Sequence, residues 1–104
     1  MPYRLIICER RDHADREAMA KTALAICRES RKASGIHSAK FYWSGADNIV
    51  FLIEGKMEAL NAGPGNNPEM GKLLFEMSDL TRMTMNIILA DPRSGEQAYR
   101  SAGR

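Results

Sequence analysis

Two strand-like runs joined by a short turn-forming segment constrain this chain more than any other feature of its sequence. Residues 36–43 and 49–54 are rich in aromatic and β-branched side chains, and residues 44–48 between them read Ser-Gly-Ala-Asp-Asn. Runs of this kind on either side of a loop containing glycine and asparagine predict a β-hairpin.

The register of this hairpin follows from keeping its apolar side chains on one face. A five-residue loop pairs Trp43 with Ile49 and Phe41 with Phe51. A four-residue loop would place Tyr42 beside Ile49 and would mix the two faces, because a slip of one residue sends every side chain to the opposite side of the sheet. We therefore expect the five-residue loop.

A strand and an amphipathic helix are predicted before the hairpin. Residues 3–10 form a short apolar run bounded by charge, which is typical of a mostly buried strand. Asp12 can then cap a helix, and small or apolar side chains recur at helical spacing until about Gly35. The other side of this helix is basic, as expected for a solvated face.

A second helix and a last strand are predicted after the hairpin. Residues 57–61 have a brief helical pattern, and Asn67 followed by Pro68 is typical of a helix cap and first turn. Residues 83–90 form the final strand. The order β-α-β-β-α-β is the ferredoxin-like motif of the α+β class, a four-stranded antiparallel sheet with two helices on one face.

Alternation along the strands assigns each side chain to one face of this sheet. The odd positions of all four strands are almost wholly apolar, which assigns them to the helices, with His37 as the exception. The even positions then form a second face, which mixes aliphatic and polar side chains: Arg4, Ile6, Cys8, Ile36, Ser38, Lys40, Tyr42, Val50, Leu52, Glu54, Thr84, Asn86 and Ile88. Burying its five aliphatic side chains is worth about 1.5 to 3 kcal/mol each. We therefore expect a homodimer whose sheets pack across this face and enclose a partly polar cavity.

The element order, the segment from Phe41 to Glu54 and the mixed second face resemble the dimeric α/β-barrel superfamily. The resemblance covers about residues 3–90 and concerns the fold. That superfamily includes cofactor-independent monooxygenases, haem-degrading enzymes, muconolactone isomerase-like proteins and members without assigned activity, so the fold by itself does not define a reaction. We expect one barrel domain, residues 1–92, and a polar tail, residues 93–104, that is ordered only if it lies on a partner.

The polar side chains expected inside the barrel are the candidate site. Tyr42 and Glu54 are the candidates for proton transfer, and Arg4, Ser38, Lys40 and Asn86 are the candidates for substrate binding. The excess positive charge of Arg4 and Lys40 over Glu54 favours a small anion or an enolate-like oxygen. A structural alternative pairs Arg4 or Lys40 with Glu54.

Two classes of function are compatible with this site. One is an oxygenase or isomerase that acts on a small hydrophobic or aromatic compound without a cofactor. The other is a non-enzymatic dimeric module that binds a metabolite or a partner. We expect no metal site, because the histidines have no ligand spacing, although haem ligation by His13 or His37 stays open.

The net charge and the short apolar runs indicate which kinds of partner and which cellular compartment to expect. Fifteen Lys and Arg against 13 Asp and Glu give a net charge of +2, which is not typical of a nucleic-acid-binding protein. The apolar run in residues 5–8 is too short for a secretory signal or a membrane span. We therefore expect a cytoplasmic protein with no nucleic-acid or membrane partner, in which Cys8 and Cys27 are small buried residues.

Overall fold

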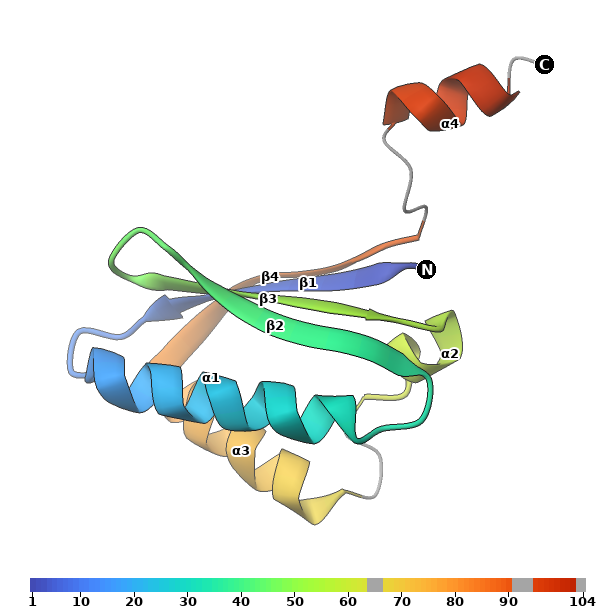
Figure 1. The fold of residues 1–104 in the computed structure, drawn as a ribbon. Coiled ribbons are helices and arrows are strands. Elements are labelled where there is room, and N and C mark those ends of the chain that lie inside the picture. Colours follow the sequence, from blue (N-terminus) through green and yellow to red (C-terminus); the bar gives the residue numbers. More distant parts are fainter. Residues whose placement is uncertain (64–66, 91–94, 103–104) are drawn as a thin grey trace.

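The sheet and its helices follow the expected order in the computed structural model, which describes residues 1–63, 67–90 and 95–102 (Figure 1). Its elements are β1 (Tyr3–Arg10), α1 (Arg16–Arg31), β2 (Ile36–Ser44), β3 (Asn48–Gly55), α2 (Met57–Asn61), α3 (Pro68–Leu80), β4 (Thr81–Leu89) and α4 (Gly95–Ala102). The strands form one antiparallel sheet in the order β2-β3-β1-β4. This arrangement confirms the ferredoxin-like α+β fold.

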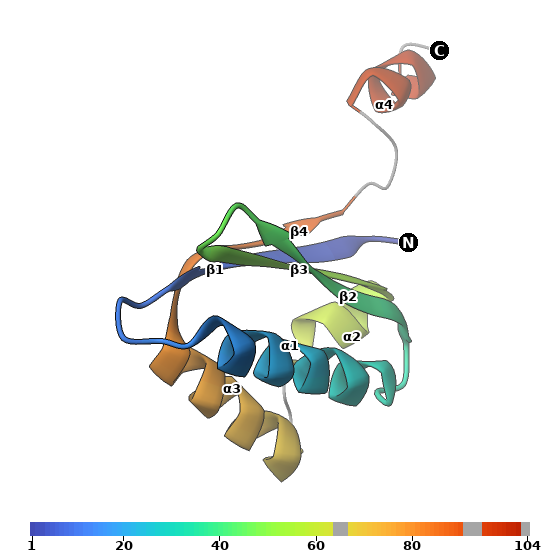
Figure 2. The same ribbon diagram turned by 60° about the vertical axis from the view of Figure 1, so that its left-hand side comes forward.

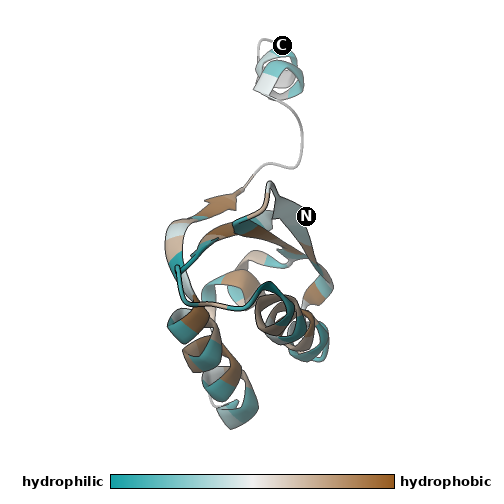
Figure 3. Ribbon diagram, turned by 90° about the vertical axis from the view of Figure 1, so that its left-hand side faces the viewer, coloured by the Kyte–Doolittle hydropathy of each residue, from teal (hydrophilic) through white to brown (hydrophobic). Residues whose placement is uncertain are grey.

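Two layers are visible when the molecule is turned (Figure 2). Helices α1 and α3 lie side by side under one face of the sheet. Helix α2 lies under the end of the sheet at which strand β1 begins. In the end-on view of Figure 3, hydrophobic residues occur both in the strands and on the helices of the second layer. Helix α4, which we did not predict, is drawn apart from both layers in Figures 1 and 2. None of the helices among the described residues is long and apolar enough to cross a membrane.

Both long helices begin at a capping side chain, but the first cap is not the expected one. Asp15, with an extended backbone, accepts a hydrogen bond from Ala18 N at 3.2 Å, so the cap of α1 lies three residues after Asp12. The Arg10 guanidinium donates to the backbone oxygens of Asp12 and Ala14, which holds the chain in a turn before the helix. The predicted cap at Asp12 was therefore wrong, and His13 lies in this turn and not in the helix.

The cap of α3 is the predicted one. Asn67 accepts from Met70 N at 3.1 Å, and Pro68 is the first helical residue. Proline is favoured there because its missing N–H would have no partner within the helix. The predicted irregular stretch before this cap includes residues 64–66, which lie outside the described part of the chain.

The hairpin has the predicted register. Trp43 pairs with Ile49, and Phe41 pairs with Phe51. On the side of the loop the ladder continues by one further pair, Ser44 with Asn48. The Phe41 and Phe51 rings lie 6.5 Å apart on the face that turns toward the helices. Here the sequence pattern was sufficient, because the two faces of the hairpin differ sharply in polarity.

The faces of β1 and β4 are the reverse of the prediction over most of their length. Directly paired residues in neighbouring strands point to the same side of a sheet. The face toward the helices therefore consists of three rows across β2, β3, β1 and β4: Ala39, Ile53, Arg4 and Ile88; Phe41, Phe51, Ile6 and Asn86; Trp43, Ile49, Cys8 and Met83. In these rows the even positions of β1, and Asn86 and Ile88 of β4, lie on the helix side.

Two physical features explain this reversal. Strand β1 is a central strand and is apolar on both sides, so alternation within it carries no information about which side faces the helices. The pairing of β4 also shifts by one residue opposite Ile7 and Cys8, which pair with Met85 and Met83. A bulge of this kind reverses the alternation of the strand, so Met83 and Asn86 share a face.

The open face, on the side of the sheet away from the helices, is more apolar than expected. Its rows across β2, β3, β1 and β4 are Ser38, Glu54, Tyr3 and Leu89; Lys40, Leu52, Leu5 and Ile87; Tyr42, Val50, Ile7 and Met85. Met85, Ile87 and Leu89 are each more than 40% exposed. Of the five aliphatic side chains predicted here, Val50 and Leu52 are present, whereas Ile6, Ile36 and Ile88 belong to the helix side.

Candidate functional site

A cavity of about 660 Å³ lies between the helix-facing side of the sheet and the helices. Its walls are mainly apolar and are formed by the strands of the sheet, by helices α1 and α3, and by the short helix α2. Side chains that line it include Ile6, Phe51 and Ile53 of the sheet, Ile26 of α1, Leu60 of α2, and Met70, Leu74 and Met77 of α3. A mainly apolar space of this size can enclose a ligand of a few fused rings.

One end of the cavity carries a fixed guanidinium group. Arg4 donates from Nε and Nη2 to the Leu60 carbonyl oxygen at 3.1 and 2.8 Å, and from Nη1 to Asn86 Oδ1 at 2.5 Å. Leu60 belongs to α2 and Asn86 to β4, so this side chain ties the short helix to the sheet. Two of the five N–H groups of a guanidinium are not used by these bonds.

A carboxylate lies at the rim formed by α1 and α3. Glu29 accepts from Asn67 Nδ2 at 3.0 Å and from Lys32 Nζ at 3.1 Å. These hydrogen bonds, with the Lys32 charge in support, hold the pKa of Glu29 below its ordinary value. The same Asn67 side chain caps α3 through its oxygen, so the rim and the helix start are built together.

The cysteine thiols are buried and free, as predicted. Cys8 lines the cavity, where burial raises its pKa despite the opposing effect of a side-chain hydrogen bond with Thr81. Burial raises the pKa of Cys27 to about 11, although Arg31 acts in the opposite direction. Both groups are therefore protonated at neutral pH, which does not favour a thiolate nucleophile.

The six candidate residues divide between the two faces of the sheet. Arg4 and Asn86 lie together in the cavity, bonded to each other. The other four occupy the open face, where the pairing places them in adjacent rows of β2 and β3: Ser38, Lys40, Tyr42 and Glu54. The single polar cluster expected from alternation is therefore two separate groups.

Glu54 has two further neighbours on the open face. The Tyr3 hydroxyl is hydrogen-bonded to the Glu54 carboxylate, and this bond and the negative charge raise the pKa of Tyr3. His37 Nε2 lies 3.8 Å from Glu54 Oε1. The pairing shifts between Ile36 and Ser38, and His37 is largely exposed beside Glu54, so its predicted place under a helix end was wrong.

Sequence reasoning missed most of the cavity. The Leu60 carbonyl that binds Arg4 is a backbone group 56 residues away, which no side-chain pattern indicates. Asn67 was predicted only as a helix cap and Glu29 was not singled out, and the packing of α1 against α3 joins them at the rim. One available signal was β1 itself, whose apolar residues on both sides show that it is central.

The fold is the ferredoxin-like α+β fold. No family model and no curated protein matches the chain. Among solved structures, Rv0793 from Mycobacterium tuberculosis is similar over 91% of this chain and 99% of its own, with a TM-score of 0.73 and 20% identity.

Two further solved structures are similar to the chain over most of its length. A candidate antibiotic biosynthesis monooxygenase from Nitrosomonas europaea matches over 89% of this chain and 100% of its own, with a TM-score of 0.74 and 11% identity. SnoaB, a cofactor-independent oxygenase from Streptomyces nogalater, matches over 90% of this chain and 95% of its own, with a TM-score of 0.74 and 5% identity. At these identities the likeness establishes the fold.

Proposed function

We propose that this protein is a cofactor-independent oxygenase that acts on a small hydrophobic aromatic compound in the cavity between sheet and helices. The observation that supports this most directly is the Arg4 guanidinium at the end of an apolar cavity of about 660 Å³. Similarity in fold to SnoaB, described as a cofactor-independent oxygenase, supports the same class of reaction.

The chemistry requires no electron donor other than the substrate. An acidic ring CH₂ that is conjugated with a carbonyl through aromatic rings can lose a proton to give an enolate, which is electron-rich enough to reduce O₂. Conversion of that CH₂ to a C=O by one O₂ releases one water, so the substrate supplies all four electrons and both hydrogens. Arg4, with N–H groups left after binding Leu60 and Asn86, stabilises the negative oxygen of the enolate.

We further propose that the protein is a homodimer joined through the open face. Leu52, Leu5 and Ile87 pair directly across β3, β1 and β4 and form a continuous apolar strip on this face of the sheet. Burying each such side chain is worth about 1.5 to 3 kcal/mol relative to water. A second copy would cover this strip, while Lys40, Tyr42 and Glu54 would retain polar partners or water at its margin.

A binding module without catalysis is the second candidate, and one observation favours it. Glu29 is a carboxylate on the cavity wall, but its bonds to Asn67 and Lys32 lower its pKa and make it a weak proton acceptor. A substrate that must lose a proton would then depend on its own acidity, which Arg4 increases. A protein that only holds a planar anion needs no base.

Oxygen uptake with anthrone tests the oxygenase. Oxidation of its central CH₂ to anthraquinone consumes one O₂ and releases one water. We expect the protein to accelerate uptake above the buffer rate, with equal amounts of O₂ consumed and anthraquinone formed. Arg4→Gln should lower the rate constant by about a hundredfold, the usual effect of removing one oxyanion donor.

Variants on other surfaces make this test specific. Lys40→Met, on the open face, and Lys21→Met, on the exposed side of α1, should retain the rate of the unmodified protein. Loss of rate in Lys40→Met would instead place the reaction at the open face. Thermal stabilisation by anthrone without any acceleration of oxygen uptake would contradict the oxygenase and support the binding module.

A further inference from the structure

The cavity reaches the surface of the molecule between α3 and β4. Its walls on α1, β1 and β3 are buried, since Ile26, Cys8 and Phe51 are each at most 4% exposed. Two apolar side chains that line the same cavity are exposed instead, Leu74 of α3 to 39% and Met83 of β4 to 55%. The opening therefore has an apolar rim on both of its sides.

The chain forms this opening by turning directly from the helix into the strand. Helix α3 ends at Leu80, and β4 begins at the next residue, Thr81. In Figure 2, β4 rises from the end of α3 to the sheet, and α3 slopes away below it. Leu74 lies about 9 Å before the end of the helix and Met83 about 7 Å after the start of the strand. The two elements thus diverge from one point, and we call the opening between Leu74 and Met83 the wedge.

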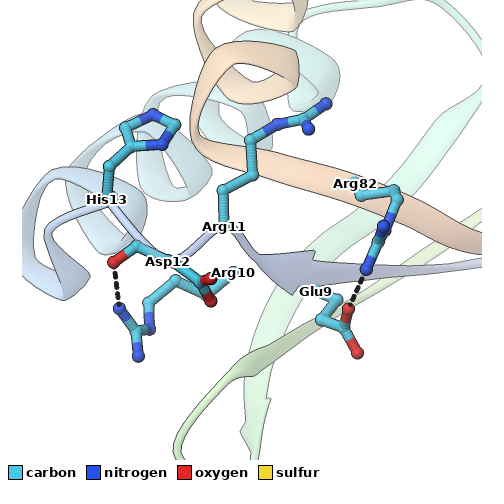
Figure 4. Close-up of a pocket in the computed structure, with 6 residues that line it drawn as sticks. All are labelled: Glu9, Arg10, Arg11, Asp12, His13 and Arg82. Atoms are coloured by element: carbon cyan, nitrogen blue, oxygen red, sulfur yellow. Dashed lines mark hydrogen bonds and ion pairs between the residues drawn. The ribbon is translucent and has the colours of Figure 1, made fainter.

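The narrow end of the wedge is fixed by Arg11. Its backbone N–H donates to Leu80 O at 3.0 Å, and its Nε donates to Ser78 O at 3.2 Å. Figure 4 shows the Arg11 guanidinium extended toward α3, away from the ion pair of Glu9 with Arg82. These bonds hold the end of α3 against the end of β1, so the wedge is closed at that point and widens away from it.

Outside the wedge, α3 continues the apolar surface. Phe75 follows Leu74 in the helix and is 70% exposed. Gly71 lies one turn before Phe75 on the same side of α3. Apart from its chain neighbours, no side chain that the structure describes lies within 4 Å of where a Cβ atom of Gly71 would be. A group that leaves the cavity past Leu74 therefore meets an aromatic ring with unfilled space beside it.

We propose that the wedge binds an apolar chain attached to the ring system that the cavity encloses. The inference rests on the proposed function, because that ring system is the substrate proposed above. Leu74 and Met83 belong both to the cavity wall and to the surface, so a substituent on the ring edge nearest β4 contacts them and continues toward Phe75. Because the wedge is continuous with the cavity, its occupant is part of the cavity ligand and not a separate molecule.

The wedge defines the substrate class more narrowly than the cavity does. Met83 pairs with Cys8, which lies four residues beyond Arg4 in β1, or about 13 Å along the strand. The reacting oxygen lies at Arg4 and the chain leaves past Met83. The chain is therefore carried by a different ring from the one that carries the reacting carbonyl, and the substrate is an alkyl-substituted compound of several fused rings.

Paired titrations with 2-methylanthraquinone and 2-pentylanthraquinone test the wedge. The two compounds share their rings and carbonyl oxygens and differ by four CH₂ groups in the chain. Quenching of the emission of Trp43, the one tryptophan in the sequence, reports binding. Complete burial of one CH₂ strengthens binding about fourfold, and the wedge leaves its walls about half exposed, so we expect the pentyl compound to bind about tenfold more tightly.

Variants at the rim make the titrations specific. Met83→Asn and Leu74→Asn should each lower the ratio of the two affinities to about threefold, because the chain then lies against a polar side chain. Binding of the methyl compound should change little. Leu24→Asn, at a side chain 38% exposed on α1 and outside the cavity wall, is the matched control and should keep the full ratio.

The outcomes separate failure of the wedge from failure of the proposed function. Equal binding of the two compounds by the unmodified protein would overturn the wedge alone, and so would an unchanged ratio in either rim variant or an equal loss in Leu24→Asn. Binding of neither compound would contradict the proposed function and the wedge with it. Because each ratio compares Kd values for two ligands on the same variant, loss of folded protein does not change it.

Discussion

The two faces of the sheet are built from the same four strands but are completed in different ways. The helix side is closed within one chain over β3, where α1 and α3 cover Ile49 and Phe51 almost fully, whereas Met83 of β4 on the same side is 55% exposed. The open face has an apolar strip of similar character, yet Met85, Ile87 and Leu89 are more than 40% exposed. The comparison shows that apolar content alone does not identify the core, since the helices decide which face is buried within the subunit.

The two faces of the sheet also differ in the polar groups that they carry. The helix side encloses space and holds Arg4 and Asn86 at the edge of that space. The open face holds Tyr3, Glu54 and Lys40 among aliphatic side chains. The first arrangement suits a ligand, and the second suits a partner surface with a polar margin.

The largest expected effect comes from placing a charge on the open face. Leu52→Asp would bury an unpaired carboxylate in the proposed interface, which opposes association strongly. Sedimentation equilibrium at micromolar concentration should report twice the 11.6 kDa chain mass for the unmodified protein and a single chain mass for the variant. Phe75→Asp, at a side chain 70% exposed on α3, is the matched control and should remain dimeric. A monomeric unmodified protein would remove the distinction between the faces that we draw here.

Shortening a buried side chain on the helix side should have a smaller effect. It should lower the free energy of unfolding and leave the dimer intact. Met19 is fully buried between α1 and the sheet, and Met19→Ala should lower the free energy of unfolding by about 2 to 5 kcal/mol. Urea unfolding measures this, and the dimer mass should be unchanged at low urea. Leu24→Ala on the same helix, at a side chain 38% exposed, should cost much less. Equal losses would mean that the helix side is not the subunit core.

The smallest expected effect is on pH dependence, where the faces should respond at opposite ends of the scale. The pKa of Glu29 is lowered in the folded state, so its stabilising contribution is full above the ordinary carboxyl range and is lost as the pH falls through the folded value. The pKa of Tyr3 is raised, so its contribution is full below the ordinary phenol range and is lost as the pH rises through the folded value.

Two conservative variants separate these contributions. Glu29→Gln should flatten the acid side of a plot of unfolding free energy against pH, and Tyr3→Phe should flatten the alkaline side. Each should leave the other limb unchanged. A change in both limbs from one substitution would show that the two groups are coupled across the sheet.

Local signals in the sequence predicted the order of the strands and helices from β1 to β4 and the hairpin register correctly, but not helix α4. The hairpin has one apolar and one mixed face, so only one register keeps them separate, and that register is observed. Asn67 with Pro68 predicted the start of α3 because capping depends on adjacent residues. Asp12 was predicted as the cap of α1, but Asp15 caps it, and local bonds from Arg10 to the backbone oxygens of Asp12 and Ala14 hold the residues before it in a turn.

The site was less predictable because it depends on relations between strands. Arg4 and Asn86 were correctly grouped, although on the wrong face, since both were misassigned together when β1 and β4 were reversed. Lys40 and Glu54 were correctly placed on the open face, but their grouping with Arg4 was wrong. Alternation describes one strand at a time, whereas a bulge and a central strand change how neighbouring strands align.

Helix α2 has a consequence for how a ligand could enter and leave. It has only five residues, too few to be stable as an isolated helix, and its N-terminal cap Lys56 makes no side-chain capping bond. Two of the bonds that fix it to the sheet come from Arg4, the group to which we assign the ligand oxygen. Local opening of α2 would release part of the cavity wall without unfolding the sheet, and its amide hydrogens should exchange with solvent before those of β1 and β3. A ligand that strengthens the hold of Arg4 would slow that exchange, so occupancy of the cavity and the lifetime of its wall are linked.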